Sequence, residues 1–319
     1  MLHSFTARFT AGFLFLLLGG CATFAPQSAA LHDNAPAGLP SKVELTEVPF
    51  YPQQDYYCGP ATLAMVLNAL GVNITVDALA EQVYLPGRKG SLQVEMLAAT
   101  RRQGLVAYRI EPQLDQLLAE VAAGNPVIVL ENYGFSWYPV WHYSVVIGYD
   151  LKNFEVVRRS GLKERQVQPL PVFEHLWKKE NYWAMVAVPP ERAPASATES
   201  GYAAAIVALE SSGHTAPAHR AYATLLERWP DNLIARIGHG NTAYALGDVR
   251  QAEAEFRRAG KDHPDSAAAF NNLAQTLADQ GLYDQALEAA DKAIALGGPL
   301  LSTAQATLDE IRKKLAAKQ

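Results

Sequence analysis

Two side chains in this sequence have the chemistry for nucleophilic catalysis, the thiol of Cys58 and the imidazole of His142. Cys58 precedes an apolar helical pattern over residues 63–70 that ends at Gly71, and Pro60 fits only the first turn of such a helix. The thiol is therefore predicted at a helix N-terminus, where free N–H groups and the helix dipole lower a thiol pKa from about 8.5. The alternative interpretation is a buried structural cysteine.

His142 begins a β-branched run over residues 142–150, directly after an aromatic loop at residues 133–141. An imidazole can accept the proton of a thiol and later pass it to a leaving amine. The alternative is a histidine satisfied within the core. Because His142 stands at the start of a strand, directly after the aromatic loop, we favour the catalytic interpretation.

The elements that must position this pair follow a simple order. Helices are expected from the Cys58 region to residue 70 and over residues 75–84, 91–103 and 113–123; strands are expected over residues 106–110, 126–130, 142–150, 154–158 and 183–188. Helices followed by a mainly antiparallel sheet indicate an α+β domain at residues 45–188.

Three blocks in this domain are similar to a known family. They are QxxxxCGPA at residues 53–61, PVIVL at 126–130 and HYSVVIGYD at 142–150. Together they resemble the papain-like C39 peptidases and their C39-like relatives, the double-glycine leader peptidases that process bacteriocins. The resemblance implies a cysteine peptidase that needs no cofactor, with Cys58 as nucleophile and His142 as general base. It also implies an oxyanion-hole glutamine, for which Gln53 is the first candidate and Gln54 the second.

One departure from the family bears on activity. The family places an aspartate after the histidine strand, whereas residues 157–161 here read VRRSG and contain no carboxylate. We therefore predict a Cys58–His142 dyad in which Ser160 weakly orients the imidazole. Asp150 is expected in a hairpin turn, away from the ring.

The aromatic loop suggests a role in substrate selection. Trp137 and Trp141 are predicted to roof a narrow groove that admits small residues such as Gly-Gly beside the scissile bond. The alternative is that these rings pack against the sheet or against the second domain.

The C-terminal part of the sequence repeats. Gly213, Gly247 and Gly281 are spaced by 34 residues, and Ala218, Ala252 and Ala286 have the same spacing. This pattern resembles tetratricopeptide repeats, in which small residues let two helices cross closely. We predict an all-α solenoid at residues 199–319, made of three repeats and a capping helix at residues 301–318, that recruits a protein partner or substrate.

The N-terminus reads as a targeting signal. The apolar run at residues 9–18 is too short to span a bilayer and leads to LGGC, which resembles a bacterial lipobox. We predict a signal peptide at residues 1–20 and lipidation of Cys21, with Ala22 indicating an outer-membrane lipoprotein that faces the periplasm. The alternative is an ordinary signal peptide. The Ala-, Pro- and Ser-rich segments 21–44 and 189–198 are predicted to be a flexible tether and a linker.

Composition excludes other classes. With 27 basic and 32 acidic residues and a net charge of −5, the chain has no basic stripe for nucleic acid. No Walker loop or metal-ligand spacing occurs in the sequence. Three functions stay open: a membrane-anchored thiol peptidase, a binding or assembly lipoprotein whose papain-like domain is catalytically weak or inactive, and an amide hydrolase or acyl transferase acting on a non-protein substrate.

Overall fold

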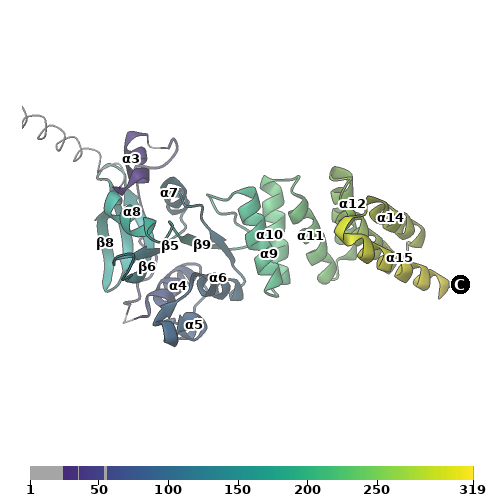
Figure 1. Ribbon diagram of the computed structural model, residues 1–319, viewed down its shortest axis with the longest axis horizontal. Helices are drawn as coiled ribbons and strands as arrows, with labels where there is room; N and C mark the ends of the chain where they lie inside the picture. Colours follow the sequence, from purple (N-terminus) through teal and green to yellow (C-terminus); the bar gives the residue numbers. More distant parts are fainter. Residues whose placement is uncertain (1–23, 35, 54–55, 319) are drawn as a thin grey trace, which may run out of the picture. The chain divides into compact units, whose positions relative to one another are not determined.

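A computed structural model describes residues 24–34, 36–53 and 56–318. They form two compact units (Figure 1). The first unit contains most of the chain up to Ala187, and the second contains residues 197–318 with two short segments from earlier in the chain.

The first unit is an α+β domain built on a seven-stranded sheet. The strand order is β4-β9-β5-β6-β7-β8, and β1 pairs with the far end of β6. The strands are β1 (Lys42–Glu44), β4 (Val106–Arg109), β5 (Val127–Asn132), β6 (Trp141–Asp150), β7 (Glu155–Ser160), β8 (Lys163–Pro169) and β9 (Ala184–Val188). The long central strand β6 pairs antiparallel with β1, β5 and β7, as the predicted fold class requires.

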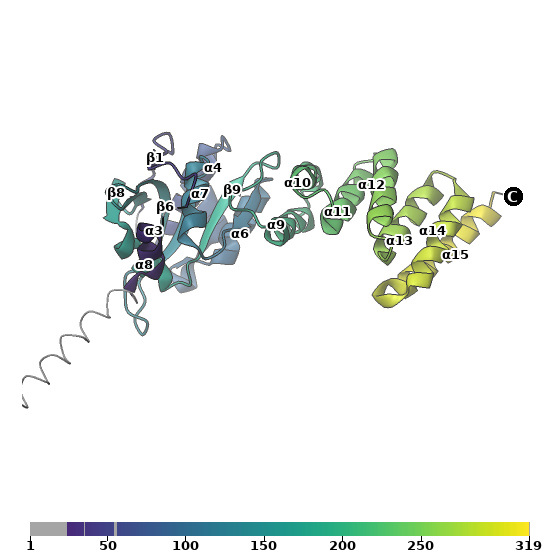
Figure 2. The ribbon, with the colours of Figure 1, turned by 90° about the horizontal axis from the view of Figure 1, so that it is seen from above.

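Helices pack on this sheet (Figure 2). They are α3 (Pro26–Asp33), α4 (Cys58–Ala69), α5 (Val76–Val83), α6 (Gln93–Arg102), α7 (Leu114–Ala122) and α8 (Leu170–Lys178). Helix α4 packs on β5 and β6, whereas α8 packs on β5, β7 and β8. A small hairpin of β2 (Tyr84–Leu85) and β3 (Gly90–Ser91), with the short 3-10 helix η1 (Pro86–Arg88) between them, lies against α4. The core between helices and sheet is apolar, as in Leu63, Met65 and Trp177.

The predicted tether at residues 21–44 is wrong for most of its described part. Residues 26–33 form α3, in which Ser28 and Leu31 are buried, and residues 42–44 form β1. The physical reason is long-range. The buried Glu174 carboxylate accepts hydrogen bonds from the backbone N–H groups of Gln27 and Ser28, which satisfies the otherwise free donors at the start of α3.

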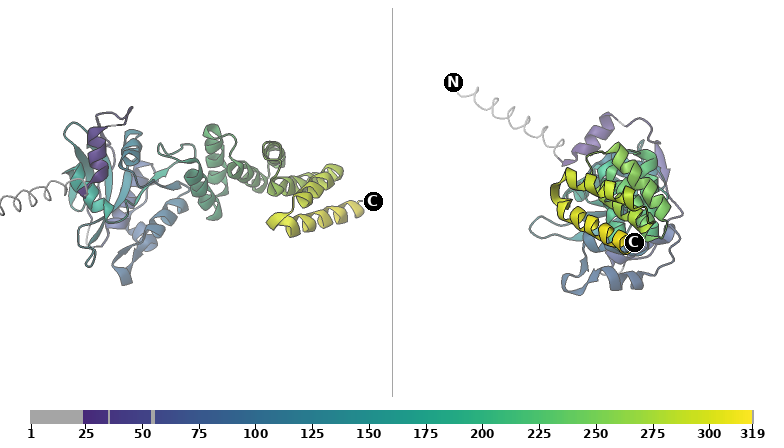
Figure 3. Two further views of the ribbon diagram at one scale, coloured as in Figure 1. Left: turned by 45° about the horizontal axis from the view of Figure 1, so that its top comes forward. Right: turned by 90° about the vertical axis from the view of Figure 1, so that its right-hand side faces the viewer.

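The second unit is a stack of antiparallel helices, coloured green to yellow in Figure 3. Residues 199–318 contain three helix pairs and a final helix: α9 (Glu199–Ser211), α10 (Thr215–Arg228), α11 (Leu233–Ala245), α12 (Val249–Asp262), α13 (Ala267–Asp279), α14 (Tyr283–Leu296), the 3-10 helix η2 (Gly298–Leu300) and α15 (Leu301–Ala316). The turn glycines Gly213, Gly247 and Gly281 all adopt positive φ angles, between +74° and +89°. The α+β domain followed by an all-α repeat confirms the predicted fold class.

Candidate active site

Cys58 is the first residue of α4, as the sequence predicted. Gly59 allows this helix start to lie against β3, because a Cβ at Gly59 would come within 2.4 Å of the Ser91 hydroxyl. The thiol is half-buried, and the backbone N–H groups of Tyr143, Gly59 and Cys58 itself lie close enough to the sulfur to favour its thiolate form. The thiol therefore lies beside Tyr143, the residue that follows His142 in β6.

The predicted direction of the Cys58 pKa is wrong. Burial raises the pKa of the thiol, and the three backbone N–H groups only partly oppose this effect. The helix terminus supplies the donors that the sequence indicated, but the loss of solvent around the sulfur outweighs them. Cys58 is therefore a neutral thiol near neutral pH.

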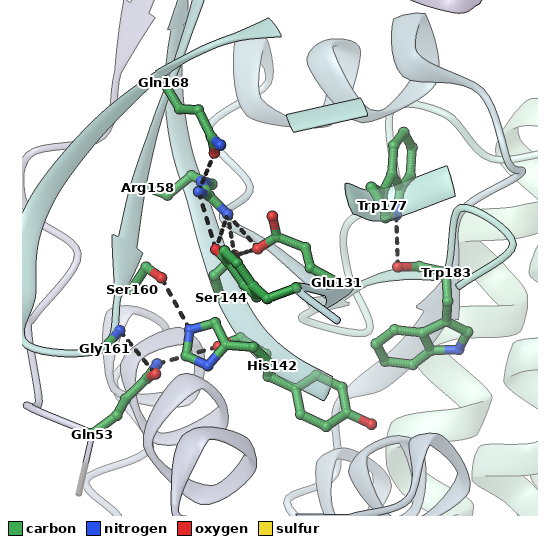
Figure 4. A network of polar contacts seen from close by, with 12 residues as sticks. Gln53, Glu131, His142, Ser144, Arg158, Ser160, Gly161, Gln168, Trp177 and Trp183 are labelled. Carbon is green, nitrogen blue, oxygen red and sulfur yellow. Dashed lines mark hydrogen bonds and ion pairs between the residues drawn. The ribbon is translucent and has the colours of Figure 1, made fainter. Parts of the chain in front are cut away.

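His142 lies near the start of β6, opposite Glu131 of β5. Its Nε2 lies 3.0 Å from the Ser160 Oγ of β7, and the Tyr133 ring meets the imidazole edge-on with centroids 5.6 Å apart (Figure 4). Burial, together with the positive charge of Arg158, lowers the pKa of His142 to about 4. The imidazole is therefore neutral near pH 7.

The candidate nucleophile Cys58 lies beside Tyr143 of β6, and the candidate base His142 is the residue before Tyr143 in the same strand. In the described part of the chain no hydrogen bond joins the Cys58 thiol to the His142 ring; the thiol instead contacts the N–H of Tyr143. Because Nε2 of His142 faces Ser160, Nδ1 is the ring nitrogen left for proton transfer. The roles of Cys58, His142 and Ser160 as a catalytic set remain predictions.

Gln53 is a buried residue that braces the site. Its Oε1 accepts a hydrogen bond from the Gly161 N–H at 2.9 Å, and its Nε2 donates to the Tyr143 carbonyl at 3.4 Å (Figure 4). The backbone N–H of Gln53 also donates to the Gly161 carbonyl. One hydrogen of the Gln53 side-chain amide is thus used in a hydrogen bond to β6. The role of Gln53 in an oxyanion hole remains a prediction. The second candidate, Gln54, lies outside the described residues.

A buried ion pair lies on the same face of the sheet as His142. Arg158 of β7 and Glu131 of β5 are both fully buried and form a salt bridge. Arg158 also donates to Gln168 and, at 3.2 Å, to Ser144, which itself donates to Glu131 at 2.7 Å (Figure 4). Burial raises the pKa of the Glu131 carboxyl, while Arg158 and Ser144 act in the opposite direction.

Tyr133 connects this ion pair to the imidazole. Its hydroxyl lies 3.5 Å from the Arg158 guanidinium and also lies near the Ser160 side chain, which favours the ionised form of Tyr133. A continuous set of polar contacts therefore runs from Glu131 through Arg158, Tyr133 and Ser160 to His142. Sequence analysis missed this set. The available signal was Glu131, a carboxylate at the end of the otherwise apolar run at residues 127–130.

Asp150 is the last residue of β6, next to the β6–β7 turn. Its carboxylate accepts hydrogen bonds from the N–H groups of Lys152 and Asn153 and forms a salt bridge with Lys42. Asp150 is eight residues along an extended strand from His142, which corresponds to roughly 26 Å. As expected, it cannot orient the imidazole.

The two loop tryptophans are not buried against the sheet. Trp137 is 80% exposed and Trp141 is 60% exposed. Trp137 stacks on Phe135, and the Trp141 indole donates to the Glu180 carboxylate. The aromatic ring that contacts His142 is Tyr133. A substrate groove under the tryptophans remains a prediction.

Other predicted features fall outside this geometry. Cys21 and the signal peptide precede the described residues. Among residues 24–34, 36–53 and 56–318, no helix combines the length and the apolar character that a membrane span needs. The same residues include no cluster of three or more His, Cys, Asp or Glu side chains suited to a metal ion.

Cys58 at a helix start and His142 at the start of a central antiparallel strand lie in an α+β domain, which is followed by paired-helix repeats. Residues 45–185 match the family described as Peptidase_C39 like, and residues 237–299 match a tetratricopeptide repeat family. Through the first of these regions the chain belongs to the C39-like peptidase family.

The chain is also similar to individual proteins. The chain is 34% identical over 107 residues to an uncharacterized protein of Methanothermobacter thermautotrophicus, which covers 34% of this chain and 68% of the relative. A crystal structure assigned as a C39-like peptidase of Bacillus anthracis is 21% identical, with a TM-score of 0.40, and the match covers 47% of this chain and 98% of that one. The Sgt2 tetratricopeptide domain of Aspergillus fumigatus is 22% identical, with a TM-score of 0.35 and coverage of 37% and 79%.

Proposed function

We propose that the first domain is a cysteine peptidase that hydrolyses peptide bonds with Cys58 and His142. The observation that carries the proposal is the place of Cys58 at the start of α4, which packs on β6, because it brings the thiol beside Tyr143, the residue that follows His142. Membership of the C39-like family supports the same assignment.

The protonation states favour general-base catalysis over a preformed ion pair. A neutral His142 has a free Nδ1 that accepts the Cys58 proton as the sulfur attacks the substrate carbonyl carbon. The imidazolium then gives that proton to the leaving amine, and a thioester remains on Cys58. Water, deprotonated by the same imidazole, attacks the thioester and releases the carboxylate product and the thiol.

The start of α4 supplies donors for the tetrahedral intermediate. The Cys58 N–H is a backbone donor at the helix N-terminus, and such groups stabilise a developing oxyanion. The second hydrogen of the Gln53 amide is the proposed side-chain partner, since only one contact to Tyr143 occupies that nitrogen.

The remaining elements of the proposal concern location and recruitment. We propose that Cys21 carries the lipid anchor of an outer-membrane lipoprotein facing the periplasm, and that the tetratricopeptide repeats recruit a protein substrate or partner. The repeats support this role because such repeats act in protein–protein interaction. Metabolic labelling with an alkynyl fatty acid tests the anchor: label is expected in wild type and in Cys58→Ser, and should be lost in Cys21→Ser.

A peptide panel tests the activity. The chain without residues 1–21, in which Cys58 is the only cysteine, is incubated with peptides containing Gly-Gly and other small pairs and, separately, with cell-wall peptides. Cleavage that disappears in Cys58→Ala and in His142→Ala supports the proposal. Turnover confined to cell-wall peptides would instead indicate an amide hydrolase acting on a non-protein substrate.

A second function is favoured by a specific observation. The raised pKa of Cys58 and the lowered pKa of His142 leave both groups neutral, a less reactive state than a thiolate. The alternative is a catalytically weak or inactive papain-like domain in a binding or assembly lipoprotein. Unchanged binding of a partner by Cys58→Ala, with no cleavage of any peptide by wild type, would favour it.

A further inference from the structure

The loop at residues 133–141, here called the aromatic loop, exposes an unusual amount of apolar surface. Phe135, Trp137, Tyr138 and Trp141 are between 60% and 80% exposed. Exposed clusters of large apolar side chains mark interaction surfaces, and Trp and Tyr suit surfaces that are apolar on one side and wet on the other.

The exposure is built into the loop. The Asn132 side chain accepts hydrogen bonds from the N–H groups of Gly134 and Val140, at 2.9 and 3.0 Å. Phe135 and Tyr138 pair through both of their backbone N–H groups, and a Cβ on Gly134 would come within 2.2 Å of the Tyr138 carbonyl. The fold therefore fixes a tight hairpin tip that presents its aromatic rings outward.

The aromatic loop is attached to the C-terminal end of α8. The Lys179 ammonium donates to the carbonyls of Asn132 and Gly134, at 3.3 and 3.0 Å. The Trp141 indole donates to Glu180 at 3.0 Å. Both contacts come from residues that directly follow α8.

The first described residues of the chain are attached to the same helix. The Phe24 ring stacks on the His175 ring, with centroids 4.1 Å apart and an interplanar angle of 9°, and Glu174 holds the start of α3. Helices α3 and α8 lie side by side in both Figure 1 and Figure 2. His175 and Lys179 are four positions apart, which puts them on one side of the helix and about 6 Å apart along its axis.

Chain length then relates the loop to the anchor. Phe24 is three positions after Cys21, and three positions of chain span at most about 11 Å. A lipid attached to Cys21 must therefore enter its bilayer close to the end of α8 that carries the aromatic loop.

We propose that the aromatic loop inserts its rings into the interface of the bilayer that holds the Cys21 anchor, and so orients the first domain on the membrane. The inference rests on the proposed anchoring at Cys21. Trp and Tyr are the residues that favour the headgroup level of a bilayer. The loop thus acts as a second membrane contact beside the acyl chains.

The test uses the full acylated chain in vesicles of phosphatidylethanolamine and phosphatidylglycerol with brominated acyl chains, which quench tryptophan on contact. We expect clear quenching in wild type and at least a threefold smaller quenched fraction in Trp137→Ala/Trp141→Ala. Both side chains are largely exposed, so the double variant should fold. Trp229→Phe, which removes a tryptophan of α10's C-cap in the second unit, is the matched control and should keep the wild-type quenched intensity.

Other outcomes overturn the inference, and they separate its failure from that of the anchor. If the acylated chain sediments with the vesicles but shows no tryptophan quenching, the anchor holds and the loop does not insert. If Cys21 carries no lipid and the chain does not sediment, the anchor itself fails, and the inference fails with it. If wild type shows no quenching and Trp137→Ala raises the KM for peptides, the aromatic loop binds substrate and not the membrane.

Discussion

The Nε2 of His142 lies 3.0 Å from the Ser160 hydroxyl oxygen, so the group that faces this ring nitrogen is a hydroxyl. A neutral hydroxyl can fix the ring orientation but stabilises an imidazolium less than a carboxylate does. Ser160 lies near Tyr133, which contacts Arg158. The imidazole is therefore oriented within a network whose nearest full charge is positive.

Removing the Ser160 hydroxyl should have a modest effect. Ser160→Ala removes one neutral hydrogen bond, worth about 1 kcal/mol, so kcat/KM for a cleaved peptide should fall roughly fivefold. Steady-state kinetics on the best peptide of the panel measures this. A loss of a thousandfold or more would mean that Ser160 performs the work of a full triad member.

Asp150 supplies the matched negative control. Asp150→Ala should change kcat/KM by less than about twofold, because the carboxylate bonds to its own turn and to Lys42. The same kinetic assay applies. A collapse of activity would show that the acidic residue of the site had been misassigned.

The reactivity of Cys58 should follow a high pKa. Because burial raises the thiol pKa above its ordinary value of about 8.5, less than about 3% should be thiolate at pH 7. Iodoacetamide alkylation of the chain without residues 1–21 should therefore accelerate steadily with pH to beyond pH 9. His142→Ala should leave the midpoint unchanged. A midpoint well below 8.5 that rises in His142→Ala would reveal a thiolate–imidazolium pair.

The first domain should lose stability in mild acid. The unfolded His142 binds a proton near pH 6.5, whereas the folded residue binds it near pH 4, so the unfolded state holds more protons between these values. Stability is then complete above about pH 6.5 and falls by up to about 3 kcal/mol as the pH drops to 4.

Tryptophan fluorescence can isolate this effect. In a Trp229→Phe background every remaining tryptophan belongs to the first domain. Urea unfolding is measured from pH 7 to pH 4 with His142 and with His142→Asn. The wild-type residue should show the steeper decline. Parallel curves would mean that His142 is readily protonated in the folded state.

The Glu131–Arg158 pair should be costly to break on one side only. Glu131→Gln or Arg158→Met leaves one buried group without its ionic partner, which typically costs about 3–5 kcal/mol. Glu131→Leu/Arg158→Met removes both charges and should cost clearly less than the sum of Glu131→Leu and Arg158→Met.

An exposed ion pair in the same sheet serves as the control for the Glu131–Arg158 substitutions. Arg165 and Glu44 form a partly exposed ion pair, and Arg165→Gln should cost less than about 1 kcal/mol in the same unfolding assay. If Arg158→Met costs no more than Arg165→Gln, the buried network does not hold the strands β5 and β7 in place.

Local patterns predicted much of the framework. The apolar period after Pro60 placed the start of α4, and the β-branched run in residues 142–150 identified β6. The 34-residue spacing of glycines matched the observed turns of the repeats. Each of these features depends on residues close together in the sequence, which is why the sequence alone was informative.

The missed features depend on distant partners or on burial. Helix α3 has no apolar period and starts where Glu174, about 146 residues away, satisfies its N–H groups. Strand β8 is an edge strand whose exposed, charged residues carry no apolar pattern. Whether the pKa of Cys58 is raised or lowered depends on how far the sulfur is buried from water, and the spacing of residues in the sequence does not predict that burial.

If Cys21 carries the proposed lipid, the docking of α3 limits how far the first domain can move from the membrane. A flexible tether from Cys21 to residue 42 would let the domain move about 25 Å from the anchor, whereas the three positions from Cys21 to Phe24 allow about 11 Å. The accessible volume is then roughly tenfold smaller. A domain with so short a tether stays within a thin layer at the membrane surface, so its substrates must be delivered to that layer.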